Sequence, residues 1–588
     1  MGRIDNQIKL RGLRIEIGEI ETNISKYPNI KQAVVVIKKI NNNDHLCAYY
    51  VANEMIDIDD LKEFLKDRLT LYMVPTVFMQ IDEMPHTPNG KTDTKKLPEP
   101  KMALNYVAPK TKLEQEICAI FSSILNIETV GAEDDFFEIG GTSLVAPKLI
   151  IELLKQGYTI RYDDIFHNKT PKELAKLLSG ESSPEEELGV EKDIIKNYDY
   201  DEINKILEEN TFKNFLDGER FELGNVLLTG VTGFLGIHIL YEFIKNEKGK
   251  IYCMLRKGRF DSCEERLIDL MDYYFDEDFT NLIGSRIILS EGDITEIGDF
   301  KKLEDEPIDT IINAAAIVKH YTADDYIFKV NVDGVINGLK FAQTRNNMKF
   351  IQISTISILS SYSLNEEAYP NQEYNERTLY YEQYLENKYL ASKFLAERMV
   401  LEAATKGLSV KIIRLGNLMS RYSDGVFQKN YDTNAFLNNV KAIKKLKAAP
   451  PIMANFETDM SQIDYVARGI LELCKTPEKS RVFHCMNNHY ISLRDIIDAL
   501  NTYGYGIEEV DVEKFKQIYE QNMNENIQGI ITTDFTIDDL GEENDFDENV
   551  KIEQTTEILH DLGFDWPKPD KEYLKRLIDY LNRFNYFE

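Results

Sequence analysis

The spacing of hydrophobic positions divides the first third of the chain into two kinds of segment. Residues 1–104 mix short β-branched runs, such as AVVVIKKI and HLCAYYVA, with an amphipathic helical segment and a turn-rich tail. From about 109 to 179 the apolar positions recur at helical spacing, with Gly-Gly and Asp-Asp in the intervening loops. These patterns predict a small α+β unit followed by a bundle of three or four short helices.

From residue 225 onward, apolar strands alternate with helices. NVLLTG is followed by KIYCMLR, RIILSEGDI, TIINAAA, FIQISTISI and VKIIRLGN. Buried runs rich in Val, Ile and Leu, spaced by helices, are typical of a parallel sheet covered on both faces. The pattern therefore predicts an α/β, Rossmann-type doubly wound domain, with a smaller C-terminal cap subdomain over the carboxyl ends of its strands.

Composition excludes several classes of partner. A formal net charge of −31 opposes binding to phosphate backbones, and no basic stripe offsets it, so nucleic acid is not expected. No apolar run approaches the roughly 20 residues that span a bilayer, and no secretory start follows Met1, so neither a membrane nor export is expected. The six cysteines form no CxxC pair and no metal-ligand spacing, which favours a reducing cytoplasm and no metal site.

A glycine-rich turn joins the first strand of the α/β domain to its first helix. In VLLTGVTGFLGIHIL, Gly230, Gly233 and Gly236 follow an apolar strand and open an apolar helix. Such glycines permit a tight turn and close approach of the backbone to a pyrophosphate at the helix N-terminus. The spacing is GxxGxxG, and its place between strand and helix predicts a dinucleotide site.

The second strand of this domain ends in basic residues. Where NAD-selective sites carry an acidic residue about 20 positions on, MLRKGRF supplies Arg256. A guanidinium pairs with a ribose phosphate, which a carboxylate would repel, so NADPH is the predicted cofactor. Arg266 is either a second contact to that phosphate or a solvated helix charge.

A tyrosine and a lysine stand four residues apart in a predicted helix. Tyr389 and Lys393, in NKYLASKFLAERM, therefore project from one face. A neighbouring ammonium is expected to lower the pKa of the phenol, so that the pair can donate a proton to a developing alkoxide. Thr355, at the end of a strand where open α/β sheets bind ligands, completes a predicted triad, with Ser354 and Ser357 as local alternatives. The competing interpretation is an exposed Tyr and Lys on a charged helix face.

These motifs together resemble the extended short-chain dehydrogenase/reductase family, and within it the thioester reductase domains that end peptide synthetases and carboxylic acid reductases. The resemblance covers about 200–588, and residues 223–588 are predicted to be the reductase domain. It implies catalysis by Thr355, Tyr389 and Lys393. It implies cofactor contacts from the following residues: Gly230, Thr232, Gly233, Phe234, Leu235, Gly236, Arg256, Arg266, Asp293, Ile294, Ala314, Ala315, Asn331, Tyr389, Lys393, Leu415 and Asn417.

Residues 106–180 resemble a peptidyl carrier domain with a four-helix bundle. DDFFEIGGTSLVAPKLI looks like the phosphopantetheine attachment motif, which makes Ser143 the attachment residue, although a serine there could also simply cap the helix. The acidic, Pro-containing ESSPEEELG lies in the segment 181–222, which is predicted to be a linker and helical lead-in to the reductase.

Residues 1–104 resemble the small C-terminal subdomain of an adenylation domain. GRIDNQIKLRGLRIEIGEIE matches its hinge motif and YMVPTVFMQIDEMPHTPNGKTD its closing motif, with Lys91 as the lysine of the acyl adenylate. Because the large subdomain with the nucleotide pocket is absent, Lys91 is expected to be inactive, and the chain is expected to be a fragment of a longer synthetase.

Together the resemblances imply an NADPH-dependent thioester reductase. It would release a peptidyl or aminoacyl thioester, carried on the phosphopantetheine of Ser143, as an aldehyde or, after a second reduction, as an alcohol. Implied partners are the upstream adenylation and condensation domains and a phosphopantetheinyl transferase. Two alternatives stay open: a carboxylic acid reductase with the same domain order, and a docking module that binds nucleotide without reducing anything. A sugar-nucleotide epimerase is disfavoured by the fused carrier.

Overall fold

The computed structural model describes most of the chain between residues 7 and 587. The residues outside the described set are 1–6, 11–12, 41–42, 67–68, 70–72, 76, 86–91, 100–105, 126, 128, 138, 142–144, 157, 159, 161–163, 166–167, 180–193, 211–219, 221, 319–325, 360–372, 384, 386, 432–433, 523–549 and 588. Two predicted site residues, Lys91 and Ser143, therefore lie outside the described residues. The chain forms two compact units, one of residues 1–190 with 321–326 and one of residues 191–320 with 327–588.

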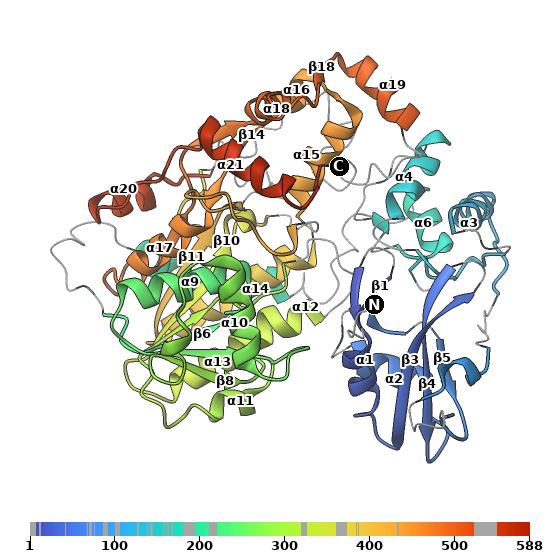
Figure 1. Ribbon diagram of the computed structural model, residues 1–588, viewed down its shortest axis with the longest axis horizontal. Helices are drawn as coiled ribbons and strands as arrows, with labels where there is room; N and C mark the ends of the chain where they lie inside the picture. The colour runs from blue at the N-terminus through green and yellow to red at the C-terminus, as the bar shows by residue number, and fades with distance from the viewer. Residues whose placement is uncertain are drawn as a thin grey trace. The chain divides into compact units, whose positions relative to one another are not determined.

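The first part of the N-terminal unit is α+β, as its hydrophobic pattern predicts. Antiparallel strands β3 (Ile30–Ile40) and β4 (Asn43–Ala52) are joined by parallel strand β5 (Val77–Gln80), in the order β3-β4-β5. Helices α1 (Ile17–Ile24) and α2 (Ile58–Lys66) bury their apolar sides in the core of this sheet. A hairpin of β1 (Gln7–Leu10) and β2 (Leu13–Glu16) precedes α1 (Figure 1).

The second part of the N-terminal unit is helical. The described helices are α3 (Lys112–Leu125), α4 (Ala146–Lys155) and α6 (Pro171–Leu178). Helix α6 begins with a capping box, in which Thr170 and Glu173 satisfy each other's backbone amides. In the core of this helical part, the rings of Phe121 and Phe136 meet edge to face, with 4.9 Å between their centroids. These features fit the predicted helical bundle.

A seven-stranded parallel sheet forms the centre of the larger unit. Its strands are β6 (Val226–Thr229), β7 (Ile251–Leu255), β8 (Ile287–Glu291), β9 (Thr310–Asn313), β10 (Lys349–Thr355), β11 (Ser409–Leu415) and β16 (Val482–Cys485). Their order in the sheet is β16-β11-β10-β9-β6-β7-β8. The chain first adds β7 and β8 on one side of β6 and then crosses to the other side of β6 with β9. Open parallel sheets bind ligands at such a switch point, beyond the carboxyl ends of the strands. The predicted Rossmann-type fold is confirmed.

The two faces of this sheet bury different side chains. Strand residues such as Leu228, Ile353 and Ile413 join one apolar core with α9 (Phe234–Asn246) and α17 (Ile463–Cys474). Helices α13 (Gly334–Gln343) and α14 (Lys388–Thr405) also contact the central strands. The side chains of β10 and β11 that point to the face covered by α13 and α14 include Gln352 and Arg414, which form hydrogen bonds there. One face is therefore largely apolar, and the other carries hydrogen-bonded polar groups.

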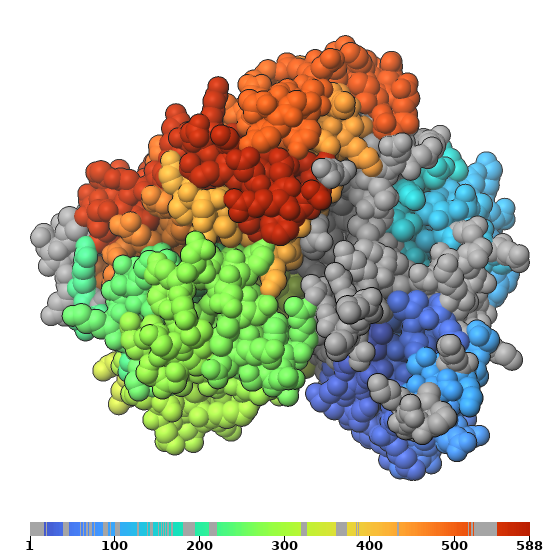
Figure 2. Space-filling model, viewed as in Figure 1, coloured from blue at the N-terminus to red at the C-terminus, as the bar shows by residue number. Residues whose placement is uncertain are grey.

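The C-terminal residues build a second apolar core within the same unit. Helices α15 (Ala435–Leu446), α18 (Leu493–Asn501) and α21 (Lys571–Asn582) supply most of it. Hydrogen bonds tie it to α10 (Cys263–Tyr274): Lys429 Nζ lies 2.7 Å from Asp269, and the hydroxyls of Tyr273 and Tyr580 are bonded. In the space-filling view the orange and red C-terminal residues adjoin the green residues of the sheet domain (Figure 2).

The described part of the segment before the sheet is packed into the larger unit. Helix α8 (Asp201–Glu208) contacts α14, and Asn210, which has no exposed surface, bonds to Val482 O and accepts from Arg481 N at 2.7 Å. Tyr200 stacks on Tyr380 at 4.4 Å between ring centroids. The described part of the predicted lead-in thus buries apolar and polar groups against the reductase core. Among the described helices, none is long and apolar enough to cross a bilayer.

Candidate functional site

The glycine turn between β6 and α9 brings the backbone of two strands together. Gly230 has a left-handed φ of +74°, and a Cβ there would lie 2.6 Å from the backbone of Ala314 and Ala315. A Cβ at Gly236 would overlap the carbonyl of Gly230. Only glycine fits these positions.

The first turn of α9 is open toward the carboxyl edge of the sheet. Its N-cap is Gly233, which has no side chain to cap the helix. Thr232 is half-buried in the turn, and Phe234 and Leu235 begin the helix, with Leu235 buried in the core. The free amides and the close backbone approach suit a dinucleotide pyrophosphate, so the residues present fit a nicotinamide cofactor.

Arg256 and Arg266 lie beside each other after β7. Arg256 Nη1 lies 3.2 Å from Asp293 Oδ2, and Arg266 Nη1 donates to the Arg256 carbonyl at 2.5 Å. The Arg256 side chain is 59% exposed. Arg266 therefore holds the turn that carries Arg256. Of these two side chains, Arg256 has its guanidinium exposed to solvent.

Two further predicted cofactor residues are held from the sheet's second side. The carbonyl of buried Ile294 accepts from Asn337 Nδ2 at 3.0 Å. Asn331 sits in a π-helical turn (Lys329–Asp333) and bonds both backbone groups of Ile317, at 2.8 and 3.0 Å. Its amide also donates to Ser392 Oγ at 2.9 Å, and Ser392 donates to the Tyr389 carbonyl at 2.8 Å. Asn331 thus joins the loop after β9 to the start of α14.

Thr355 and Tyr389 meet at the carboxyl end of β10. Burial raises the pKa of the Tyr389 phenol to about 12, and a side-chain hydrogen bond with Thr355 opposes that rise. The expected lowering of this pKa by Lys393 is wrong, because burial dominates and the lysine amine is directed to a carbonyl. Tyr389 therefore stays a protonated phenol at neutral pH and can act as a proton donor.

Lys393 is buried one helical turn after Tyr389. Its Nζ donates to the Ile353 carbonyl at 2.7 Å. Burial lowers the pKa of this amine to about 8, and the carboxylate of Glu397 opposes the shift. The amine is therefore still mostly protonated at neutral pH. The alternative of an exposed Tyr and Lys on a charged face is wrong, because Tyr389 and Lys393 are 7% and 4% exposed.

The two serines that compete with Thr355 have different surroundings. Ser357 Oγ lies 3.1 Å from Thr355 Oγ1 and supports it. Ser354 Oγ is buried with no hydrogen-bond partner among the described residues. Thr355 is the hydroxyl that bonds Tyr389, so it fits the predicted role better than either serine.

The last two predicted cofactor residues lie at the end of β11. Leu415 is buried in the apolar core. Asn417 bonds Asp459 through both its backbone amide, at 3.0 Å, and its side chain, at 2.9 Å. Its side chain thus holds strand β14 (Glu457–Asp459).

The sequence interpretation missed an ion pair beneath the tyrosine and lysine. Arg414 donates to both oxygens of Glu397, at 2.8 to 3.2 Å, and both side chains have no exposed surface. Arg414 also contacts His484 Nε2 at 3.2 Å and the Thr378 carbonyl at 2.8 Å. A charged residue inside an apolar strand was the available signal, because such residues are rarely buried unpaired.

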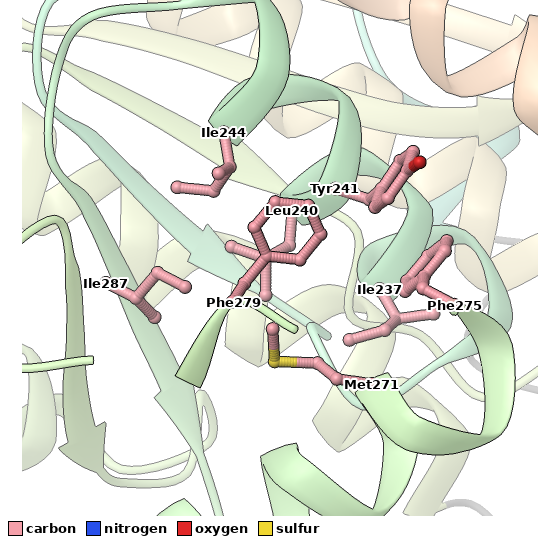
Figure 3. A pocket seen from close by; sticks show the side chains of 8 residues that line it. All are labelled: Ile237, Leu240, Tyr241, Ile244, Met271, Phe275, Phe279 and Ile287. Atoms are coloured by element: carbon pink, nitrogen blue, oxygen red, sulfur yellow. The ribbon is translucent and has the colours of Figure 1, made fainter. Parts of the chain in front are cut away.

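An apolar recess lies away from these residues, between α9, α10 and β8. Its lining is Ile237, Leu240, Tyr241, Ile244, Met271, Phe275, Phe279 and Ile287 (Figure 3). The room inside for water-sized spheres is about 10 Å³, enough for roughly one water molecule. It offers no room for a substrate and is a packing defect of the core.

The surroundings of Ser143 are described up to Gly141. The Gly141 amide donates to the Phe136 carbonyl at 2.7 Å, and a Cβ at Gly141 would overlap the Phe136 ring. The Gly-Gly pair therefore lets the chain pass over the core phenylalanine immediately before the predicted attachment serine.

Comparison with known proteins agrees with this arrangement. Family profiles match residues 19–91 (AMP-binding enzyme C-terminal domain), 115–178 (phosphopantetheine attachment site) and 228–470 (an NAD-binding family described as male sterility protein). A solved thiolation-reductase di-domain from an archaeal non-ribosomal peptide synthetase is 80% identical, with a TM-score of 0.78, and matches 82% of this chain and 100% of that one. The chain belongs to the nonribosomal peptide synthetases. It carries a thiolation domain followed by an NAD-binding reductase domain.

Other nonribosomal peptide synthetases match over smaller shares of their length. A linear gramicidin synthase from Brevibacillus parabrevis is 27% identical over 99% of this chain and 12% of its own length. The isonitrile lipopeptide synthase of Mycobacterium tuberculosis (strain ATCC 25618 / H37Rv) is 30% identical over 61% of this chain and 15% of its own. The chain thus spans a small part of these synthetases. The reductase domain of the aureusimine biosynthetic cluster, 25% identical over 66% of this chain and 98% of its own, aligns with a TM-score of 0.53.

Proposed function

We propose that this chain releases a carrier-bound peptidyl or aminoacyl group by reducing its thioester with NADPH. The observation that carries the proposal is the meeting of Thr355, Tyr389 and Lys393 at the carboxyl end of β10, in a chain that also contains a phosphopantetheine attachment domain. The same edge of the sheet holds the glycine turn. A hydride donor and a proton donor would therefore meet at one place.

Tyr389 is the proposed proton donor. Its phenol is protonated at neutral pH, because burial holds the pKa at about 12, and its bond to Thr355 fixes the direction of the hydroxyl. Both hydroxyls would stabilise the negative charge that develops on the thioester oxygen. Lys393, with a pKa near 8, would carry a positive charge beside them for most of the time at neutral pH.

Bound NADPH would supply the hydride to the thioester carbonyl carbon. The oxygen takes the proton from Tyr389, which gives a hemithioacetal. The carbon–sulfur bond of the hemithioacetal then breaks. The aldehyde leaves, and the proton of the hemithioacetal hydroxyl passes to the thiolate of the carrier. A second hydride transfer to the aldehyde would give an alcohol.

The carrier would deliver the substrate on a phosphopantetheine arm at Ser143, attached by a phosphopantetheinyl transferase. Tethering raises the effective concentration of the thioester, so a weak contact between carrier and reductase would suffice. Upstream adenylation and condensation domains would load the carrier. All six cysteines are described; they form no disulfide and five are buried, which suits the reducing cytoplasm proposed as the location.

The deciding experiment gives the protein a synthetic acyl-pantetheine thioester and NADPH and follows both cofactor oxidation and product by mass spectrometry. Aldehyde or alcohol formed in proportion to oxidised NADPH supports the proposal. If NADPH binds and no thioester of several acyl types is reduced, the chain is a docking module instead.

A further inference from the structure

A row of buried polar side chains crosses three strands of the sheet. Thr229 on β6, Asn313 on β9 and Gln352 on β10 lie opposite one another in register. Thr229 Oγ1 donates to Asn313 Oδ1 at 2.5 Å, and Asn313 Nδ2 donates to Gln352 Oε1 at 2.9 Å. All three side chains are 1–2% exposed. Buried amides destabilise a core unless they are hydrogen-bonded. Three bonded polar side chains in the middle of a sheet therefore need a structural explanation.

The row ends on the carbonyl that holds Lys393. Gln352 Nε2 donates to Ile353 O at 2.8 Å, and Lys393 Nζ donates to the same oxygen at 2.7 Å. Pairing between β9 and β10 stops at Asn313 and Gln352. Ile353 is the first residue beyond it, where a carbonyl with two lone pairs can accept both side-chain donors.

We propose that Gln352 is a positioning residue for Lys393, acting through the Ile353 carbonyl. Its amide fixes the direction of that oxygen, and Asn313 in turn fixes the amide. The other end of the row adjoins the glycine turn, because Gly230 follows Thr229 and Ala314 follows Asn313 in the chain. The row therefore sets the distance between the cofactor turn and the lysine amine, and this role rests on the proposed function.

The charged groups around Lys393 determine how a substitution at Gln352 should change the pKa of the Lys393 amine. Glu397, on the same helix, favours the charged amine, and it is shared with Arg414 of β11. His484 of β16 faces Arg414, and burial lowers its pKa to about 3, so it is neutral. Tyr389 is also uncharged at neutral pH. A carboxylate at position 352 would add a new negative charge on the strand side of the amine.

The test uses two variants and a matched control in the full chain. Gln352→Met keeps the volume and removes the amide, and Gln352→Glu keeps an acceptor for Asn313 and adds a charge. The control, Asn225→Leu, removes an amide at the opposite end of the same sheet that bonds the segments leading into β7 and β9, at Lys250 N (2.9 Å) and Pro307 O (2.7 Å). Fluorescence of Trp566, the single tryptophan, verifies folding of this unit.

Two measurements decide the proposal. The pKa of the Lys393 amine, followed by NMR of 13Cε-lysine protein and assigned with Lys393→Met, should rise by at least about one unit in Gln352→Glu. The kcat of thioester reduction should fall about tenfold or more in Gln352→Met, since small misplacements of reacting groups are costly. Asn225→Leu should change neither.

The proposal is overturned if the Lys393 pKa is unmoved in Gln352→Glu, or if Gln352→Met loses no more kcat than Asn225→Leu. The NMR measurement does not require turnover. If the wild-type protein reduces no thioester, the proposed function fails, while an unmoved Lys393 pKa in Gln352→Glu still overturns the positioning role.

Discussion

Two lysines are buried on opposite faces of the same sheet, and they look alike by most measures. Lys393 on α14 and Lys411 on β11 are 4% and 2% exposed. Each bonds backbone carbonyls, Lys393 that of Ile353 and Lys411 those of Pro477 and Ser480, at 2.7 to 3.0 Å. Burial lowers both pKa values, to about 8 and about 7.

Their surroundings separate them. Lys393 lies one turn from a phenol at the carboxyl edge of the strands, where ligands bind, whereas Lys411 lies near the start of β11 and caps the chain that follows α17. A lowered pKa therefore marks burial and does not by itself mark catalysis. Position at the sheet edge and a hydroxyl neighbour distinguish the proposed catalytic lysine from the structural one.

Replacing each lysine by methionine should give the largest difference between them. Lys393→Met should lower kcat/KM for thioester reduction by about 10³-fold, because it removes the cation beside the proton donor. Lys411→Met should keep kcat/KM within about threefold of wild type. Steady-state NADPH oxidation measures both. Equal losses in the two variants would show that burial, and not position, decides the effect.

Tyr389→Phe isolates the proton donor while leaving Lys393 in place. The phenol is the proposed proton donor, so its loss should cut kcat by about 10²-fold or more. Thr355→Val, which removes the bonded hydroxyl and keeps the shape, serves as the graded comparison and should have a smaller effect. Turnover at the wild-type rate in Tyr389→Phe would remove the tyrosine from its role.

The fold of the reductase unit could be predicted from sequence because its signals are local. Apolar runs between helices gave the parallel sheet, and the GxxGxxG spacing gave the turn whose Gly230 has a positive φ. Tyr389 and Lys393 could be placed together because helical spacing puts residues four apart on one face. Each of these inferences uses residues within one segment.

Features that depend on contacts between distant segments could not be predicted. The polar row joins Thr229, Asn313 and Gln352, which come from three strands, and register is invisible in one sequence. The predicted direction of the Tyr389 pKa shift was wrong for a related reason. Helical spacing shows that Lys393 is near, but it does not show that Tyr389 is buried or that the lysine amine bonds the Ile353 carbonyl. Gln352, polar in a buried strand, was a local anomaly that could have been noticed.

The two lysines also predict how stability changes with pH. An amine whose pKa is 10.5 when exposed and about 7 when folded binds more protons in the unfolded state across that range. The free energy of unfolding should therefore rise with pH, by about 2 kcal/mol between about pH 7 and pH 9 from Lys411 alone. Urea unfolding followed by Trp566 fluorescence should show that Lys411→Met lacks this part of the rise. An unchanged pH dependence in that variant would mean that Lys411 is charged in the folded protein.

Arg256 carries the smallest expected effect, because it is exposed where the lysines are buried. The prediction that it binds the ribose phosphate implies that Arg256→Ala should raise KM for NADPH about tenfold and leave KM for NADH unchanged. Losing its surface ion pair with Asp293 would alone contribute only about 0–1 kcal/mol and would affect both cofactors alike. Arg259→Ala, a neighbouring exposed arginine, is the control. Equal changes in the two KM values would therefore assign Arg256 to holding Asp293 and would leave the preference for NADPH without a residue to explain it.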